Sequence, residues 1–168
     1  MAFTPGFDGG ITVVQYAATC VSSDGGSRRA ATSFGFVGPI VVYGLTNSKT
    51  YRCTVNATTA QGQSAPSAAS NLVTVGAPGR PTKPRLSRIG AGHLKVSFAS
   101  PASHGAPITR FKAVCRSTDG GVSRGKAGAA SPLGVKRLTS GKIYTCTVTA
   151  TNSRGTGPAS VASKAVRA

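Results

Sequence analysis

The chain has 168 residues, of which only 6% are aromatic and none is Trp, while Gly (22) and Pro (10) together approach a fifth of the total. Twenty basic residues against three acidic ones give a net charge of +17, which attracts polyanions such as nucleic acid, acidic glycans or cell-wall polymers. With three Asp and no Glu, the chain lacks the paired carboxylates of glycosidases, and it contains no apolar run of the ~20 residues that a membrane span requires.

One stretch of the sequence occurs twice. Residues 45–57 and 138–150 both follow the pattern Leu-x5-Tyr-x-Cys-x-Val-x-Ala, and the two copies lie 93 positions apart without a gap. A repeat at this distance predicts two units of about 80–90 residues. The charge is divided unevenly between them, because residues 1–79 carry a net charge of +2 and residues 80–168 carry +15.

The first unit has the pattern of short strands separated by turns. No window repeats apolar residues at helical spacing, whereas Thr and Val recur between turns that contain Gly and Pro. Asp24, Gly25 and Gly26 predict a hairpin turn after the first strand. Residues 1–10, which include Asp8, are expected to be loop, and strands are expected at residues 13–21, 29–33, 40–43, 51–58 and 69–75.

A proline-rich segment at residues 77–84 predicts a short, fairly stiff linker that leads into the second unit, because Pro restricts the backbone. Beyond it, Asp119, Gly120 and Gly121 repeat the hairpin signal of the first unit. Strands are expected at residues 85–89, 93–98, 108–116, 124–126, 131–137, 144–152 and 158–166.

The second unit contains a set of motifs at fixed spacing: Pro81-x-x-Pro84, Leu94-x-Val96-x-Phe98, Ile108-x-x-Phe111, Leu138-x5-Tyr144-x-Cys146-x-Val148-x-Ala150-x-Asn152 and Gly155-x-Gly157-x-x-Ser160. With seven short strands at this spacing, these motifs resemble the fibronectin type III sandwich, and the likeness extends over residues 80–168. Phe98 stands where that family usually has Trp, which reduces the volume of one core side chain. The resemblance implies an all-β fold of two tandem fibronectin type III-like (immunoglobulin-like) β-sandwiches from a bacterial-type secreted or surface protein.

The first unit is shorter than the family pattern. Cys20 and Cys115 are 95 positions apart, so Gly10 aligns with Gly105 and only nine residues precede it. Strands A and B are therefore expected to be missing, which leaves residues 1–76 as a truncated domain with strands C to G beside a complete domain at residues 80–168. A shortened sequence explains this, and so does another chain that supplies the missing strands by β-addition.

The resemblance also implies how the four Cys pair. In this fold strands C and F are neighbours in one sheet, and each unit has one Cys on each of them, so Cys20–Cys53 and Cys115–Cys146 disulfides are expected. An immunoglobulin-type bridge would need a Cys on strand B, and a zinc site would need clustered ligands such as C-x-x-C; the sequence has neither.

The repeated stretch further resembles the tyrosine corner of the family. The corner positions are Leu45 and Tyr51 in the first unit, and Leu138 and Tyr144 in the second. Each tyrosine hydroxyl is expected to bond back to the connecting loop.

Disulfides favour an oxidising compartment, so a secreted or cell-surface location is expected. The first eight residues have neither a basic nor an apolar region, so this sequence shows no signal peptide.

The basic second unit supplies the candidate binding residues. Alternation along strand C places Arg110, Lys112 and Arg116 on its outward side, and the next strand is expected to add Arg124 and Lys126 to one flat cationic ribbon. Such a ribbon, beside outward threonines of strand F, is a candidate polyanion-binding surface.

No catalytic residue, metal ligand or cofactor is assigned. His93 and His104 have no evident chemical partner in the sequence, and no Gly-x-Ser-x-Gly elbow or phosphate-binding glycine loop opens a helix. The chain is therefore predicted not to be an enzyme.

Three functions are compatible with these features. The first is a non-catalytic extracellular binding or spacer module of a larger secreted or cell-surface protein, with an unknown protein or surface polymer as its partner. The second is a polyanion-binding module for nucleic acid, anionic glycan or cell-wall polymer, which uses the second domain. The third, by analogy alone, is an accessory domain of a polysaccharide-degrading enzyme.

Overall fold

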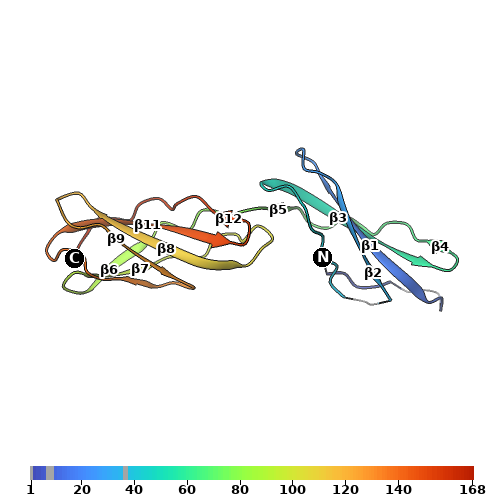
Figure 1. Cartoon of the computed structure of the whole chain (residues 1–168), viewed down its shortest axis with the longest axis horizontal. Coiled ribbons are helices and arrows are strands. Elements are labelled where there is room, and N and C mark those ends of the chain that lie inside the picture. The colour runs from blue at the N-terminus through green and yellow to red at the C-terminus, as the bar shows by residue number, and fades with distance from the viewer. Residues whose placement is uncertain (1, 7–9, 36–37) are drawn as a thin grey trace. The chain divides into compact units, whose positions relative to one another are not determined.

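The computed structural model describes residues 2–6, 10–35 and 38–168, which leaves Asp8 outside the described residues (Figure 1). Within those ranges every regular element is a β-strand, as the all-β prediction states. The chain divides into two units, residues 1–75 and residues 76–168. The described residues hold no helix that would cross a membrane.

The first unit contains one antiparallel sheet. Its strands are β1 (Val13–Ser22), β2 (Arg29–Phe34), β3 (Lys49–Thr59), β4 (Gly62–Gln63) and β5 (Val73–Val75). They follow the order β2-β1-β3-β4, and β5 also pairs with β3. Along β1, buried side chains alternate with more exposed ones, so one face of the sheet is apolar. On that face Tyr16, Ala18, Ile40 and Val55 form a cluster, and the ring of Phe3 packs on Tyr16 with centroids 5.0 Å apart.

The strand expected at residues 40–43 is not formed. Its counterpart in the second unit is β10 (Leu133–Val135), which is a strand because it pairs with β7 (His93–Ser97). Among the described residues of the first unit, no strand corresponds to β7, so residues 40–43 lie against the sheet without a ladder of their own.

The second unit is a two-sheet sandwich. One sheet has the order β10-β7-β6, with β6 at Arg85–Gly90. The other has the order β12-β11-β8-β9, and β13 also pairs with β11. Its strands are β8 (Ile108–Ser117), β9 (Arg124–Gly128), β11 (Ile143–Asn152), β12 (Gly155–Thr156) and β13 (Val166–Arg167).

The core of the second unit lies between these sheets. Leu94 and Val96 from β7 pack with Phe111, Ala113 and Val148 from the facing sheet, and all five side chains are buried. Phe98 packs on Phe111 with ring centroids 5.0 Å apart. Burial of this apolar surface is the main force that holds the two sheets together.

Serine side chains replace a regular strand along one edge of β11. The amides of Cys146 and Val148 donate to the hydroxyl oxygens of Ser163 (3.0 Å) and Ser160 (2.9 Å). The backbone amides of these two serines donate in return to the carbonyls of the same β11 residues. Residues three apart, rather than two apart, therefore face β11, and the strand expected at residues 158–166 is reduced to β13.

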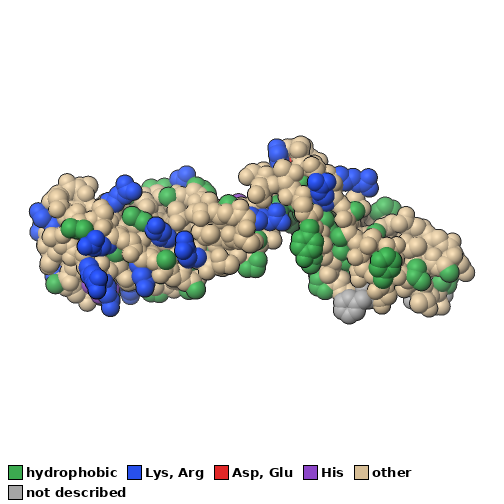
Figure 2. Space-filling view, in the orientation of Figure 1, with side chains coloured by type: hydrophobic (Ala, Val, Ile, Leu, Met, Phe, Trp, Pro, Cys, Tyr) green, Lys and Arg blue, Asp and Glu red, His purple; other side chains and the backbone are tan. Residues whose placement is uncertain are grey.

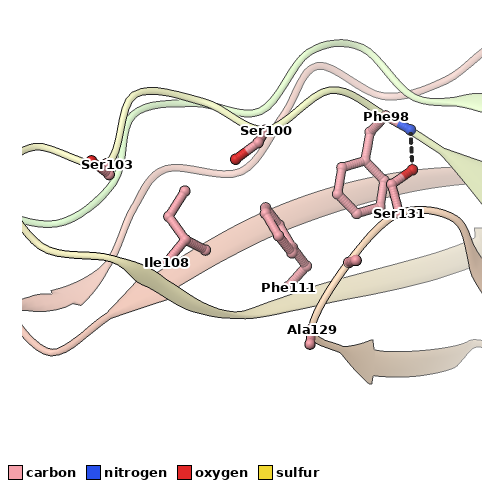
Figure 3. A pocket seen from close by; sticks show the side chains of 8 residues that line it. Phe98, Ser100, Ser103, Ile108, Phe111, Ala129 and Ser131 are labelled. Carbon is pink, nitrogen blue, oxygen red and sulfur yellow. Dashed lines mark hydrogen bonds between the residues drawn. The ribbon is translucent and has the colours of Figure 1, made fainter.

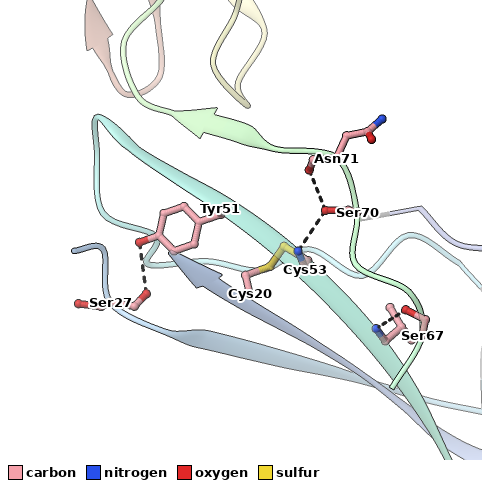
Figure 4. Close-up of a disulfide and its surroundings, with 8 residues drawn as sticks. Cys20, Ser27, Tyr51, Cys53, Ser67, Ser70 and Asn71 are labelled. Carbon is pink, nitrogen blue, oxygen red and sulfur yellow. Dashed lines mark hydrogen bonds between the residues drawn. A yellow bond between two sulfur atoms is a disulfide. The ribbon is translucent and has the colours of Figure 1, made fainter. Parts of the chain in front are cut away.

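The first unit repeats this arrangement along β3. The amides of Cys53 and Val55 donate to the hydroxyls of Ser70 and Ser67, both at 3.0 Å (Figure 4). Ser64 bonds the amide of Ala57 in the same way. The strand expected at residues 69–75 is consequently only Val73–Val75, because the three-residue period of the serines is incompatible with the two-residue period of a ladder.

Candidate functional site

Both units hold a disulfide on the core side of their longest strands. Cys20 and Cys53 are directly opposite each other on β1 and β3, and Cys115 and Cys146 occupy the same positions on β8 and β11. In each pair the Cα atoms are 4.0 Å apart and the sulfurs are bonded. Figure 4 shows the Cys20–Cys53 disulfide of the first unit. The bridges therefore join the central strands of each unit. The bonded cysteines are 33 residues apart in the first unit and 31 residues apart in the second.

A buried tyrosine closes the corner before each long strand. The hydroxyl of Tyr144 accepts a hydrogen bond from the amide of Thr139 (2.9 Å) and donates to the carbonyl of Val122 (3.1 Å). Tyr51 accepts from Thr46 (3.0 Å) and donates to Ser27 (3.2 Å). The corner therefore also reaches the hairpin that follows β1 or β8, a contact that the sequence pattern does not reveal. Leu138 is buried beside it.

The aspartate of each hairpin anchors the start of the long strand. Asp119 accepts from the Ser117 hydroxyl (2.5 Å) and from the Ile143 amide (3.0 Å). These bonds, the Ser117 bond first, hold the pKa of Asp119 below its usual value. The hydrogen bond from Ser22 to Asp24 lowers the pKa of Asp24 in the same way, with the Thr50 amide as the next contribution. Both carboxylates thus have a structural role.

Three exposed cations lie on the outer side of β8. Arg110, Lys112 and Arg116 pair with threonines on β11, and Val114 lies among them. We call Arg110, Lys112 and Arg116 the strand face. In the view of Figure 2, Lys and Arg side chains are scattered over the second unit.

The structure does not extend the strand face onto β9. Arg124 is opposite Cys115 and Lys126 is opposite Ala113, and directly opposed residues point to the same side of a sheet. Because Cys115 and Ala113 are buried, Arg124 and Lys126 point to the inner side. The expectation of one flat ribbon of five cations is therefore wrong; the missing information was the register of the hairpin that joins β8 to β9.

Two further cations, which the sequence analysis did not select, lie beside Arg124 and Lys126. Lys136 and Arg137 follow β10, and together with Arg124 and Lys126 they line one hollow. A comparison of the two repeats would have indicated them, because Lys136 and Arg137 align with the uncharged Tyr43 and Gly44.

Another hollow, of about 420 Å³, opens at one end of the second unit (Figure 3). Phe98, Ile108 and Phe111 line it together with small and hydroxyl side chains. Its one hydrogen bond among the drawn residues runs from the Phe98 amide to the Ser131 hydroxyl (3.0 Å). None of the side chains that line it is ionisable, and its polar side chains are the hydroxyls of Ser100, Ser103 and Ser131.

The two histidines are held separately. The ring nitrogen Nδ1 of His104 lies 2.7 Å from the carbonyl of Ala77, and Nε2 of His93 is buried against Gly134. In the part of the chain that the structure describes, no group of three His, Cys, Asp or Glu comes together as a metal site would require.

Asn152 fastens the beginning of the second unit to this sandwich. Its buried amide nitrogen donates to the carbonyls of Gly76 (2.8 Å) and Ser103 (2.9 Å), and its oxygen accepts from the amide of Arg154 (2.8 Å). The second unit therefore includes residues from Gly76 onward.

A family model for the fibronectin type III domain matches residues 79–166, more than half of the chain. The chain belongs to the fibronectin type III family. The match falls on the unit that has two sheets, a tyrosine corner and a disulfide between β8 and β11. Fibronectin type III domains generally serve as binding or spacer modules and are typically non-catalytic.

The chain is similar to several solved structures. The twitchin kinase region from C. elegans is 20% identical, with a TM-score of 0.50, over 54% of this chain. The titin kinase with its flanking domains is also 20% identical (TM-score 0.49, 55% of this chain), and a two-domain segment of chicken tenascin is 18% identical (TM-score 0.48, 99% of this chain and 88% of that one). The chain spans 17% of the titin structure and 17% of the twitchin structure. No curated protein sequence matches the chain.

Proposed function

We propose that the chain is a non-catalytic extracellular module, made of tandem fibronectin type III domains, that binds a partner or spaces other domains in a larger bacterial-type secreted or cell-surface protein. Residues 1–76 form its first, truncated domain, residues 77–84 lead into the second, and residues 80–168 form the complete domain.

The observation that carries this proposal is the pair of equivalent disulfides, Cys20–Cys53 and Cys115–Cys146. Disulfides persist outside the reducing cytosol, and small domains with modest cores depend on them. All four Cys are used, since none of the described cysteines is free.

The test uses the protein isolated from its own cells. Mass spectrometry without reductant is expected to find no free thiols and one disulfide-linked peptide pair within each unit. Digestion of the protein by a protease added to intact cells places it outside the membrane if the proposal holds. Four free thiols in freshly isolated protein would overturn it.

A second function is favoured by the charge of the second unit. Residues 80–168 carry +15, with Asp119 as their only acidic residue, and the strand face presents Arg110, Lys112 and Arg116 together on one side of β8. We infer that this unit binds polyanions. Retention of the protein on immobilised heparin or DNA at physiological salt supports this function, and no retention excludes it.

The single sheet of the first unit bears on its assembly. We propose that another polypeptide supplies strands to the first unit by β-addition, because the inner cluster around Tyr16 and Val55 has no second sheet over it among the described residues.

A further inference from the structure

The two sheets of the second unit meet at one edge in a hollow of about 840 Å³. We call it the edge groove, and it is lined by Arg124, Gly125, Lys126, Gly134, Lys136 and Arg137. Four of these residues are cations and the other two have no side chain. We propose that the edge groove is a binding site for an anionic polysaccharide, which it holds through carboxylate or sulfate groups. The proposal rests on the second function above and adds a site separate from the strand face.

The register of β9 directs two of the cations into the groove. Arg124 and Lys126 point to the inner side of their sheet, as their partners Cys115 and Ala113 do. Cys115 and Ala113 are covered by the facing sheet, whereas β9 is the last strand at its edge. The long side chains of Arg124 and Lys126 therefore extend past the core and remain exposed beside β10.

Arg124 is also held in place across the groove. Its Nε donates to the carbonyl of Arg137 at 3.3 Å, so one residue of β9 is tied to the turn after β10. This bond uses one of the five N–H groups of the guanidinium. An orientation fixed in advance lowers the conformational entropy that this side chain would otherwise lose on binding an ion.

Arg137 occupies a backbone conformation that favours glycine. Its φ is +59°, in the left-handed region, and the equivalent residue of the first unit is Gly44, with φ of +73°. An L-residue other than glycine is strained there, because its Cβ lies too close to the following carbonyl oxygen. The backbone thus gives no reason for arginine at this position, and a role of its side chain does.

The first unit serves as an internal comparison. It keeps the bond that holds the arginine, because Nε of Arg29 donates to the carbonyl of Gly44 at 3.1 Å. The other three cations have no counterpart: the positions of Lys126, Lys136 and Arg137 are occupied by Ala31, Tyr43 and Gly44. One cation belongs to the shared fold, and three are additions of the second unit.

No carboxylate side chain of the second unit neutralises these cations. Asp119 is the only acidic residue from Gly76 onward, and its carboxylate already accepts from Ser117 and Ile143. Four positive charges around one hollow repel each other, and a polymer with several negative groups relieves that repulsion at several points at once.

The aromatic residues favour a glycan over a single-stranded nucleic acid. Stacking of bases on aromatic side chains supplies much of the affinity for single strands. The second unit has only Phe98, Phe111 and Tyr144; Phe111 and Tyr144 are buried, and Phe98 packs on Phe111.

A protective role is the competing explanation. Both β9 and β10 are edge strands, and charged side chains on edge strands prevent sheets of different molecules from joining. Under that explanation, the cations would affect aggregation and leave ligand binding unchanged.

The experiment compares two charge-matched variants of the full chain, each built from residues of the first unit. The groove variant is Lys126→Ala with Arg137→Gly, as in Ala31 and Gly44. The strand-face variant is Arg110→Gln with Lys112→Ala, as in Gln15 and Ala17. Each loses two positive charges, and thermal unfolding establishes that each remains folded. Binding to heparin, as the sulfated polysaccharide, and to a single-stranded oligonucleotide is measured in ~0.15 M salt.

We expect the groove variant to bind heparin at least about tenfold more weakly than the unaltered chain, and the strand-face variant to lose clearly less. Equal losses in both variants would overturn the groove while leaving polyanion binding intact. No heparin binding by the unaltered chain would overturn both. Tighter binding of the oligonucleotide than of heparin would overturn the choice of a glycan, and aggregation of the groove variant with unchanged affinity would support the protective role instead.

Discussion

Gly121 lies directly against the hydroxyl group of Tyr144. A methyl group on Gly121 would overlap that oxygen, and Gly26 and Tyr51 stand in the same relationship in the first unit. The close approach allows the hairpin after β8 to lie over the ring, where Val122 accepts the hydroxyl proton. One contact thereby joins a hairpin and a corner that are far apart in the sequence.

Replacing Gly121 with alanine is expected to destabilise the second unit, because the new methyl group displaces the Tyr144 ring or the hairpin. Overpacking of this kind costs about 1–3 kcal/mol. The free energy of unfolding in urea measures the effect. Gly90→Ala is the matched control, since a Cβ there meets its nearest atom at 3.9 Å. Equal stabilities of the two variants would contradict the contact.

Removing the Tyr144 hydroxyl is a separate prediction about the same corner. Tyr144→Phe leaves the Thr139 amide and the Val122 carbonyl without the partner that each has at about 3 Å. We expect a loss of about 1–3 kcal/mol of unfolding free energy, because the residue is fully buried. Tyr43→Phe, on an exposed ring, is the control and should change little.

The Cys115–Cys146 disulfide is expected to supply a large part of the stability of the second unit. Closing a loop of about 31 residues restricts the unfolded chain by about 3–4 kcal/mol. Replacing both cysteines with alanine should lower the free energy of unfolding of the second unit by about this amount, and its urea midpoint should fall with it. The first unit keeps its own bridge. An unchanged midpoint would show that the β8–β11 pairing needs no cross-link.

Acid is expected to weaken both hairpins. The folded-state pKa values of Asp24 and Asp119 lie below the value of about 3.9 for an unfolded chain, chiefly because the hydroxyls of Ser22 and Ser117 bond the ionised forms. The stability that they add is complete above the unfolded pKa and is lost as pH falls through the folded pKa. Unfolding temperatures should therefore be flat from pH 7 to about 5 and fall below about pH 4.

The double variant Asp24→Asn with Asp119→Asn keeps an oxygen that accepts hydrogen bonds but removes the titrating groups. Its unfolding temperature should be lower near neutral pH and should decrease less below pH 4. A variant that follows the unaltered chain over the whole range would exclude these carboxylates as the acid-sensitive groups.

Ser163 is expected to be needed for the edge of β11. Ser163→Ala leaves the buried amide of Cys146 without its side-chain acceptor, which should cost about 1–3 kcal/mol. Hydrogen exchange of that amide provides a local measurement and should become faster. Ser123→Ala is the control, because Ser123 is exposed in the loop between β8 and β9.

Supply of strands to the first unit by a second copy of the chain has a direct consequence in solution. Light scattering should then give a mass that rises above 16.8 kDa toward a dimer as concentration increases. A folded monomer at every concentration would rule out donation between copies.

Features with a local or repeated signal could be predicted from the sequence. The alternation around Cys115 and Cys146, the two Asp-Gly-Gly turns and the Leu-x5-Tyr pattern indicated the long strands of both units. The absence of a strand at residues 40–43 could not be predicted from the sequence, because a strand forms only beside a hydrogen-bonding neighbour. In the second unit the equivalent strand β10 has β7 as that neighbour, and the described residues of the first unit include no counterpart of β7.

The candidate site was less accessible from the sequence. The side of β9 on which Lys126 lies depends on which residue it faces on β8, and the loop between these strands is too long for a two-residue turn to set the register. Lys136 and Arg137 join the site from the other sheet, and their proximity to Arg124 is a property of the sandwich. The hydrogen bonds of Ser160 and Ser163 to β11 could not be predicted from the sequence either. Their three-residue spacing matches neither the period of a helix nor that of a β-ladder.

The three-residue spacing of those serines also limits which changes of length the protein tolerates. Ser64, Ser67 and Ser70 each hold one residue of β3, and the intervening pairs of residues only bridge the distance. After a deletion or insertion of three residues in this segment, every third residue still faces β3. The segment is then shifted along β3 by one serine position. Deleting one or two residues moves every later hydroxyl away from the strand. Length variation in this segment is therefore expected to occur in multiples of three.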